Sequence, residues 1–111
     1  MTKYKKEKFD KDDIRLARIA KALGHPARIA ILRHLSLVNE CSFNEISRDL
    51  PLADSTVSQH LAELKSASLV LGTFEPPKIK YCINADEWKQ ARKLLKGFAK
   101  IKPGKETVEL S

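Results

Sequence analysis

Small hydroxyl and amide side chains gather in one short stretch of this chain, which reads Ser55-Thr56-Val57-Ser58-Gln59-His60. Hydroxyl groups can donate hydrogen bonds to phosphates or to base edges. The amide of Gln59 can form two hydrogen bonds with adenine, and the methyl group of Thr56 can contact thymine. Val57, Leu61 and Leu64 recur at i, i+4 and i+7, which predicts a helix from about residue 54 to 66 with the polar residues facing outward.

A second short helix is predicted just upstream, from Ser42 to Leu50. Ser42 and Glu45 have the spacing of a capping box, in which each side chain binds the backbone N–H of the other residue. Pro51 ends this helix, because the residue before a proline is disfavoured in helical geometry. Two short helices separated by a tight turn are the layout of a helix-turn-helix, whose second helix enters a DNA major groove. We therefore expect DNA contacts from four residues: Ser55, Thr56, Ser58 and Gln59.

Alternatives stay open for several of these polar and basic residues. Hydroxyl residues also start helices well, and Gln59 could be merely solvated. His60 lies beside the inward Leu61, where packing competes with a phosphate contact. The segment 78–84 alternates with period two and predicts the second strand of a β-hairpin spanning about 70–84. Phosphate contacts are expected from its Lys78 and Lys80 and from Arg28 and Arg48, although the lysines could be solvated and the arginines could pair with acids such as Asp49.

Further helices are predicted on both sides of this unit. One spans about residues 9–23 and ends at Gly24 in a left-handed conformation, and the next begins near Pro26. The last spans about 85–99, with Pro103 and Gly104 ending it. The fold class is mainly α with a small β-hairpin. We expect one domain over 9–101 between a basic tail at 1–8 and a flexible tail at 102–111.

The order of elements and two motifs together resemble the arsenic-repressor (ArsR) family of bacterial and archaeal regulators. Residues 22–32 are similar to its Leu-Gly-x-Pro-x-Arg-x-x-Ile-Leu signature, residues 55–61 to its recognition helix, and residues 81–83 to its returning wing strand. The resemblance implies a winged helix-turn-helix that regulates transcription by binding DNA. It departs from the family at Pro51, where a glycine is usual, so the turn must follow a different backbone route.

The resemblance also implies a homodimer whose interface is built by the first and last helices, and we expect it to act as a repressor on a partly palindromic operator. Apolar stripes on those helices agree, because they exceed what one small domain can cover, although they could instead complete the monomer's core. The expected interface residues are Leu16, Ile19, Leu23, Trp88, Leu95 and Phe98.

The sequence indicates less about the sensing of an effector, such as a metal or an oxidant, than about DNA binding. The family's cysteine metal ligands correspond here to Ser42, Phe43 and Asn44, and the last helix contains no histidine, so we expect no metal and no cofactor. Cys41 and Cys82 are candidates for thiol sensing, although both could be ordinary small side chains. A redox- or metal-responsive repressor and a winged helix that binds protein instead of DNA remain the alternatives, and the effector is unknown.

Composition limits the other functional classes that the protein could belong to. The chain has 111 residues and a formal net charge of +7, which favours polyanionic partners. It lacks an apolar run of the ~20 residues needed to span a bilayer and has no secretory signal, so we expect no membrane partner. Two cysteines in such a chain favour the reducing cytoplasm. No Gly-rich phosphate loop or nucleophile–base pair stands at a recognisable spacing, so we do not expect an enzyme.

Overall fold

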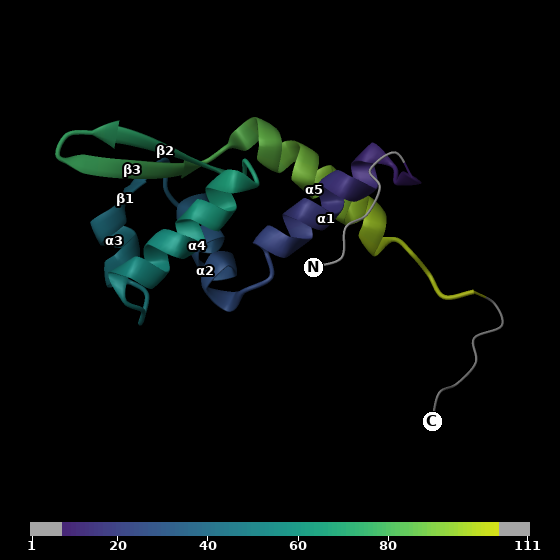
Figure 1. The fold of residues 1–111 in the computed structure, drawn as a ribbon, viewed down its shortest axis with the longest axis horizontal. Helices are drawn as coiled ribbons and strands as arrows, with labels where there is room; N and C mark the ends of the chain where they lie inside the picture. Colours follow the sequence, from purple (N-terminus) through teal and green to yellow (C-terminus); the bar gives the residue numbers. More distant parts are fainter. Residues whose placement is uncertain (1–7, 105–111) are drawn as a thin grey trace, which may run out of the picture.

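The computed structural model describes residues 8–104 and has a mainly helical fold with one small sheet (Figure 1). The expected winged helix-turn-helix architecture is confirmed. In chain order the elements are α1 (Lys11–Ala22), α2 (Pro26–Ser36), β1 (Cys41–Ser42), α3 (Phe43–Arg48), α4 (Asp54–Ser66), β2 (Val70–Glu75), β3 (Lys78–Ile83) and α5 (Ala85–Ala99). Most of each predicted tail lies outside the described residues.

The three strands form an antiparallel sheet in the order β1-β3-β2. The hairpin pairs Val70 with Ile83 at its base and Glu75 with Lys78 at its tip. On the other edge of β3, Cys41 pairs with Tyr81 and Ser42 with Lys80. The sequence did not predict β1, because two residues are too short to show an alternating pattern. The sheet thus connects the start of α3 directly to the wing.

One apolar core lies between the helices and the base of the sheet. The predicted stripe on α4 is confirmed, because Val57, Leu61 and Leu64 are all fully buried. Ile31 and Leu35 of α2 lie in the same core, with other buried residues from most of the elements. Each buried aliphatic side chain contributes roughly 1.5–3 kcal/mol, so this core fixes α4 with its polar side outward.

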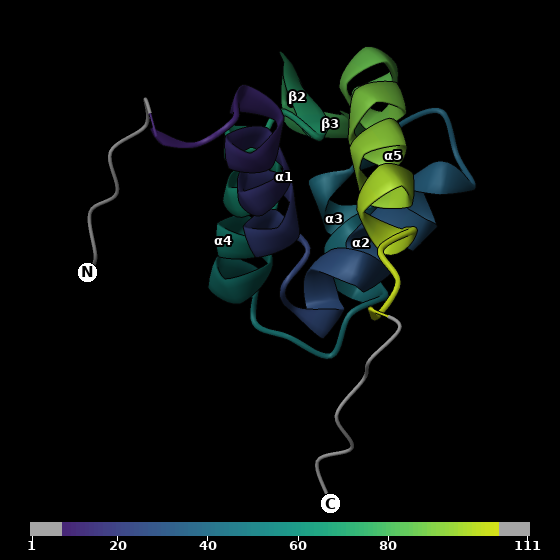
Figure 2. The same ribbon diagram turned by 90° about the vertical axis from the view of Figure 1, so that its right-hand side faces the viewer.

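The terminal helices α1 and α5 pack against each other and extend away from α3 and the wing (Figure 1). In Figure 2, α4 lies at the left of the molecule and α5 at the right. Asp10 caps α1 by accepting a hydrogen bond from the Asp12 N–H at 2.7 Å, and Asn84 accepts from the Glu87 N–H in the first turn of α5. These caps satisfy backbone donors that a helix start leaves free.

One predicted helix end differs from the structure. Gly24 does not adopt a left-handed conformation, since no described glycine has positive φ, and the cap of α1 is Leu23 with φ of −85°. A Cβ atom at Gly24 would lie 3.2 Å from the Lys21 carbonyl oxygen, so glycine here relieves a close approach. The helix α5 ends at Ala99, as predicted, and Lys100 forms its cap.

Candidate DNA-binding surface

The outer face of α4 is polar. Ser55, Ser58 and Gln59 are exposed and Thr56 is half-buried. Within residues 8–104, none of these four side chains makes a hydrogen bond or ion pair with another part of the chain. Their donors and acceptors therefore point away from the core and are available to base edges or phosphates. The predicted contacts of these four residues with DNA stay predictions.

The start of α4 is held without a side-chain cap of its own. Ala53 stands at the cap position and makes no side-chain hydrogen bond, while the carboxylate of Asp54 accepts a hydrogen bond from the Ser47 hydroxyl of α3. An acidic residue in the first turn also suits the positive end of the helix dipole. The two helices of the motif are thus linked at the turn that contains Pro51.

His60 packs inside the motif, which is one of the two roles that its sequence position left open. Its ring lies 4.3 Å from the ring of His25, measured between centroids, with an interplanar angle of 39°. Burial lowers the pKa of His60, and the neighbouring His25 and Arg28 lower it further. A neutral ring turned toward His25 does not supply positive charge to the outer face.

His25 has a structural role that the sequence analysis missed. Its Nδ1 atom accepts a hydrogen bond from the Ala27 N–H at 3.0 Å and so caps α2, whose first residue is Pro26. Proline at the first helical position was the available signal, because it places the capping residue immediately before it. His25 thus fixes the start of α2 and contacts α4 at the same time.

Arg28 pairs with an acid, the alternative that its sequence left open, and its phosphate contact stays a prediction. Its side chain is only 15% exposed, and one guanidinium nitrogen lies 3.8 Å from a carboxylate oxygen of Glu63 on α4. Its Nε atom is buried and has no hydrogen-bond partner within residues 8–104. The guanidinium is thus directed into the protein, where it ties α2 to α4. Arg48 is exposed in the last turn of α3, and its phosphate contact stays a prediction.

The two wing lysines differ in their surroundings. Lys80 Nζ lies 3.1 Å from Glu75 Oε2 and 3.2 Å from Glu40 Oε1. Hydrogen bonds from Lys80 to Glu75 and Glu40 raise the pKa of the lysine, and the two carboxylates neutralise its charge toward DNA. Lys80 therefore braces β3, and its expected phosphate contact stays a prediction. Lys78 is exposed at the wing tip and makes no ion pair with any residue from 8 to 104.

Apolar residues at the wing were also not anticipated as surface. On the predicted common face of β3, Tyr81 and Ile83 are half-buried, whereas Ile79 near the hairpin tip is exposed. It pairs across the hairpin with Phe74, which is exposed as well. Both lie near the tip of the hairpin, beyond the reach of the core.

The predicted interface residues separate into two groups. Ile19 is 0% exposed and belongs to the core of the single chain, so its expected contact with a second copy is wrong. Leu23, Trp88 and Leu95 are partly buried against the same core. Leu16 and Phe98 instead line an open groove of about 930 Å³ between α1 and α5, and Phe98 is 59% exposed.

The cysteines are free and do not face one another. Cys41 pairs with Tyr81 across the sheet, so Cys82, the next residue of β3, points to the opposite face. Cys41 is buried, its Sγ atom lies 3.4 Å from His34 Nε2, and its thiol donates to Glu45 at 3.7 Å. Burial raises the pKa of the Cys41 thiol, and the Glu45 carboxylate raises it further. Both effects disfavour the reactive thiolate that thiol sensing needs.

No group of three or more His, Cys, Asp and Glu side chains among residues 8–104 is arranged to hold a metal ion. In the same part of the chain, no helix is both long enough and apolar enough to cross a membrane.

The fold, the polar outer face of α4 and the β2–β3 wing define a winged helix-turn-helix protein. A family model described as "Bacterial regulatory protein, arsR family" matches residues 25–70. The chain is 34% identical over 89 residues to the transcriptional activator HlyU of Vibrio cholerae, and the match covers 80% of this chain and 82% of HlyU. The chain belongs to the arsR family.

Two further comparisons agree with this assignment. The transcriptional regulator CmtR of Mycobacterium tuberculosis is 37% identical over 68 residues, or 61% of this chain, and the matched part spans only 57% of CmtR. A solved structure of HlyU from Vibrio cholerae N16961 superposes with a TM-score of 0.66 at 29% identity, covering 83% of this chain and 100% of that one.

Proposed function

We propose that this protein is a sequence-specific DNA-binding transcriptional regulator, with no enzymatic activity, that inserts α4 into a major groove. The observation that carries the proposal is the outer face of α4, where Ser55, Ser58 and Gln59 are exposed and unbonded to the rest of the described chain. The net charge of +7 supports attraction to phosphates. Membership of a family of bacterial regulatory proteins agrees, and binding to chromosomal DNA would place the protein in the cytoplasm.

We further propose that the active form is a homodimer. The open groove between α1 and α5 is lined mostly by charged side chains, but it also exposes Phe98 beside Leu16. A second copy would cover these two apolar residues. A two-fold dimer would present two copies of α4 to successive major grooves, with half-sites ~34–36 Å apart on a partly palindromic operator.

The proposed outcome of binding is repression. A dimer that covers two successive major grooves would exclude other proteins from that stretch of DNA. The relative HlyU is named a transcriptional activator, so the sign of regulation is a separate measurement. A promoter–reporter fusion should give higher expression when this protein is deleted, and lower expression on deletion would show activation instead.

The test of α4 uses Gln59→Ala against a matched amide control. Asn39→Ala removes an exposed amide from the loop before β1, away from α4. Gln59→Ala should weaken binding to the preferred operator by ~1–3 kcal/mol and leave binding to random duplexes unchanged. Asn39→Ala should behave as the unsubstituted protein. Unchanged operator preference in the Gln59 variant would remove this residue from the reading face.

A protein-interaction module is the second candidate, because the wing exposes three apolar side chains: Leu71, Phe74 and Ile79. The two functions differ in their response to salt. Binding to DNA through phosphate neutralisation weakens steeply as salt rises, whereas an apolar protein interface does not. A titration of duplex binding over a range of salt concentrations therefore separates them.

A further inference from the structure

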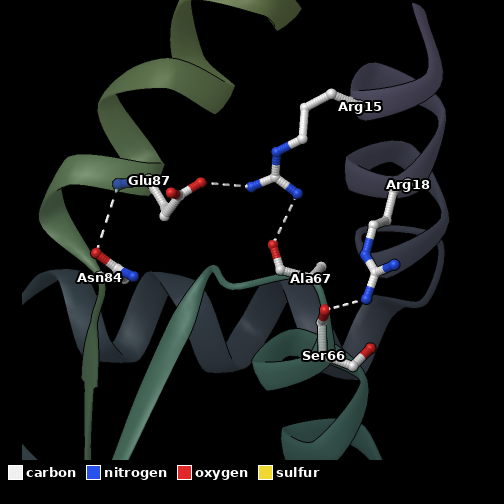
Figure 3. A network of polar contacts seen from close by, with 6 residues as sticks. All are labelled: Arg15, Arg18, Ser66, Ala67, Asn84 and Glu87. Carbon is white, nitrogen blue, oxygen red and sulfur yellow. Dashed lines mark hydrogen bonds and ion pairs between the residues drawn. The ribbon is translucent and has the colours of Figure 1, made fainter. Parts of the chain in front are cut away.

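Two arginines of α1 contact the end of α4, far away in the sequence (Figure 3). A guanidinium nitrogen of Arg15 donates to the Ala67 carbonyl oxygen at 2.9 Å, and Arg18 donates to the Ser66 carbonyl oxygen. The same Arg15 side chain forms an ion pair with Glu87, in the first turn of α5, at 2.8 Å. One side chain thus joins the two terminal helices to the carboxyl end of the proposed recognition helix.

These arginines complete the hydrogen bonding of that helix end. The last carbonyl groups of a helix lack partners within the helix and carry the negative end of its dipole. At the end of α4, the carbonyl groups of Glu63, Leu64 and Lys65 accept hydrogen bonds from backbone N–H groups. The donors are the N–H groups of Ala67, Leu69 and Ser68, respectively. The next two carbonyl groups, those of Ser66 and Ala67, accept hydrogen bonds from the guanidinium groups of Arg18 and Arg15.

The segment that connects α4 to β2 is also held in place. Leu69 is fully buried, and its carbonyl oxygen accepts a hydrogen bond from the Asn84 N–H at 2.9 Å. Ala67 is buried as well, so its carbonyl would lose its only charged partner if Arg15 were removed. The start of α4, in contrast, is linked to α3 through Ser47 and Asp54 at an exposed turn.

We propose that Arg15 and Arg18 are positioning residues for DNA recognition: they set the tilt of α4 by fixing its carboxyl end to α1. This inference rests on the proposed function, because it assumes that α4 reads DNA. The reading residue Ser55 lies about 16 Å along the helix from Ser66 at 1.5 Å per residue. A tilt of about 5° about the fixed end moves Ser55 by about 1.4 Å, which is enough to break a base contact.

The consequence is a direct link from α1 to base recognition. Leu16 of α1 is the residue next to Arg15. It lines the groove that a second copy would cover. A movement of α1 would change the contacts of Arg15 and Arg18 with the carboxyl end of α4.

The experiment compares the double variant Arg15→Ala/Arg18→Ala with a charge-matched control. The control, Lys21→Ala/Arg33→Ala, also removes two positive charges, one from α1 and one from α2, and neither side chain bonds α4. Two quantities are measured: the ratio of affinity for the preferred operator to affinity for a random duplex, and the orientation of α4 relative to α2 from backbone residual dipolar couplings.

The double variant should lower the affinity ratio about tenfold or more, the effect of losing at least one base contact, while its random-duplex affinity matches that of the control. The dipolar couplings should show a changed orientation of α4. The conservative Arg15→Lys/Arg18→Lys variant should recover part of the ratio, because each lysine can still donate to one carbonyl. A ratio equal to that of the control, or an unchanged orientation, would overturn the proposal.

The remaining outcomes are also decisive. If the double variant unfolds, the single variant Arg18→Ala, which keeps the Arg15–Glu87 ion pair, takes its place in both measurements. If the unsubstituted protein prefers no DNA sequence, the proposed function fails. The dipolar couplings then decide separately whether the arginines orient α4, and an unchanged orientation removes the positioning role.

Discussion

The rings of His25 and His60 lie against each other, with their centroids 4.3 Å apart, and they join the start of α2 to the middle of α4. His25 caps α2, while His60 stands on the helix that we propose reads DNA. Arg28 of α2 acts on His60 electrostatically, and Arg28 itself pairs with Glu63 of α4. This contact makes the packing of α4 sensitive to protonation.

The pH dependence of this contact has a definite sign. Burial, His25 and Arg28 lower the pKa of His60 in the folded chain below its ordinary 6.5. The unfolded chain therefore binds the proton more readily, and the stabilisation by neutral His60 is complete above pH 6.5 and is lost as the pH falls below it. The free energy of unfolding is measured by urea denaturation about one pH unit above and about one pH unit below that value. The difference between the two free energies should be smaller for His60→Gln than for the unsubstituted protein.

The variant His34→Gln is the control, because it replaces a histidine and leaves the His25–His60 pair in place. An equal pH dependence in His60→Gln and in the unsubstituted protein would show that the pair does not contribute to it.

The capping box at α3 should contribute measurably to stability. The Ser42 hydroxyl accepts from the Glu45 N–H at 3.3 Å and donates to the Glu45 carboxylate at 3.0 Å. Ser42→Ala should lower the free energy of unfolding by about 1 kcal/mol, the usual effect of losing a serine cap. The exposed Ser58→Ala should change it by less than about 0.5 kcal/mol. Equal effects in the two variants would contradict the capping role.

A stabilising substitution is available at the end of α4. Ser68 has φ of 64°, a left-handed conformation that disfavours side chains other than glycine. Its N–H and that of Leu69 bind the carbonyls of Lys65 and Leu64, which is the Schellman pattern. Ser68→Gly should raise the free energy of unfolding by about 1 kcal/mol, and Ser68→Ala should not. A loss of stability in the glycine variant would show that the serine side chain matters more than the backbone strain.

The two wing lysines, Lys78 and Lys80, should differ in how much each contributes to DNA binding. Lys78→Ala should weaken binding to all duplexes alike and reduce the slope of log affinity against log salt by about 1. Lys80→Ala should reduce the slope less, because Glu75 and Glu40 already neutralise that charge. Binding isotherms at several salt concentrations measure both slopes, and a larger reduction for Lys80 would contradict the assignment.

The local features of this fold could be predicted from the sequence. The helix α4 and its buried face follow from the spacing of Val57, Leu61 and Leu64, and the start of α3 follows from the spacing of Ser42 and Glu45. These signals lie within one or two helical turns, so no knowledge of the tertiary structure is needed to read them.

The contacts that position the site could not be predicted in this way. Arg15 and Ala67 are 52 residues apart, and no periodic pattern connects them. Lys80 and Arg28 have the residue type of phosphate ligands, but their neighbours in space are carboxylates supplied by other elements. The apolar stripe of α1 does not distinguish residues that face the chain's own core, such as Ile19, from residues left on the surface.

The most direct test of the account is selection of bound duplexes from a random-sequence DNA pool, followed by footprinting of the best duplex. We expect a partly palindromic sequence with two protected half-sites ~34–36 Å apart, and loss of the base preference in Gln59→Ala. Recovery of no preferred sequence, with equal binding to every duplex, would contradict recognition of DNA by α4.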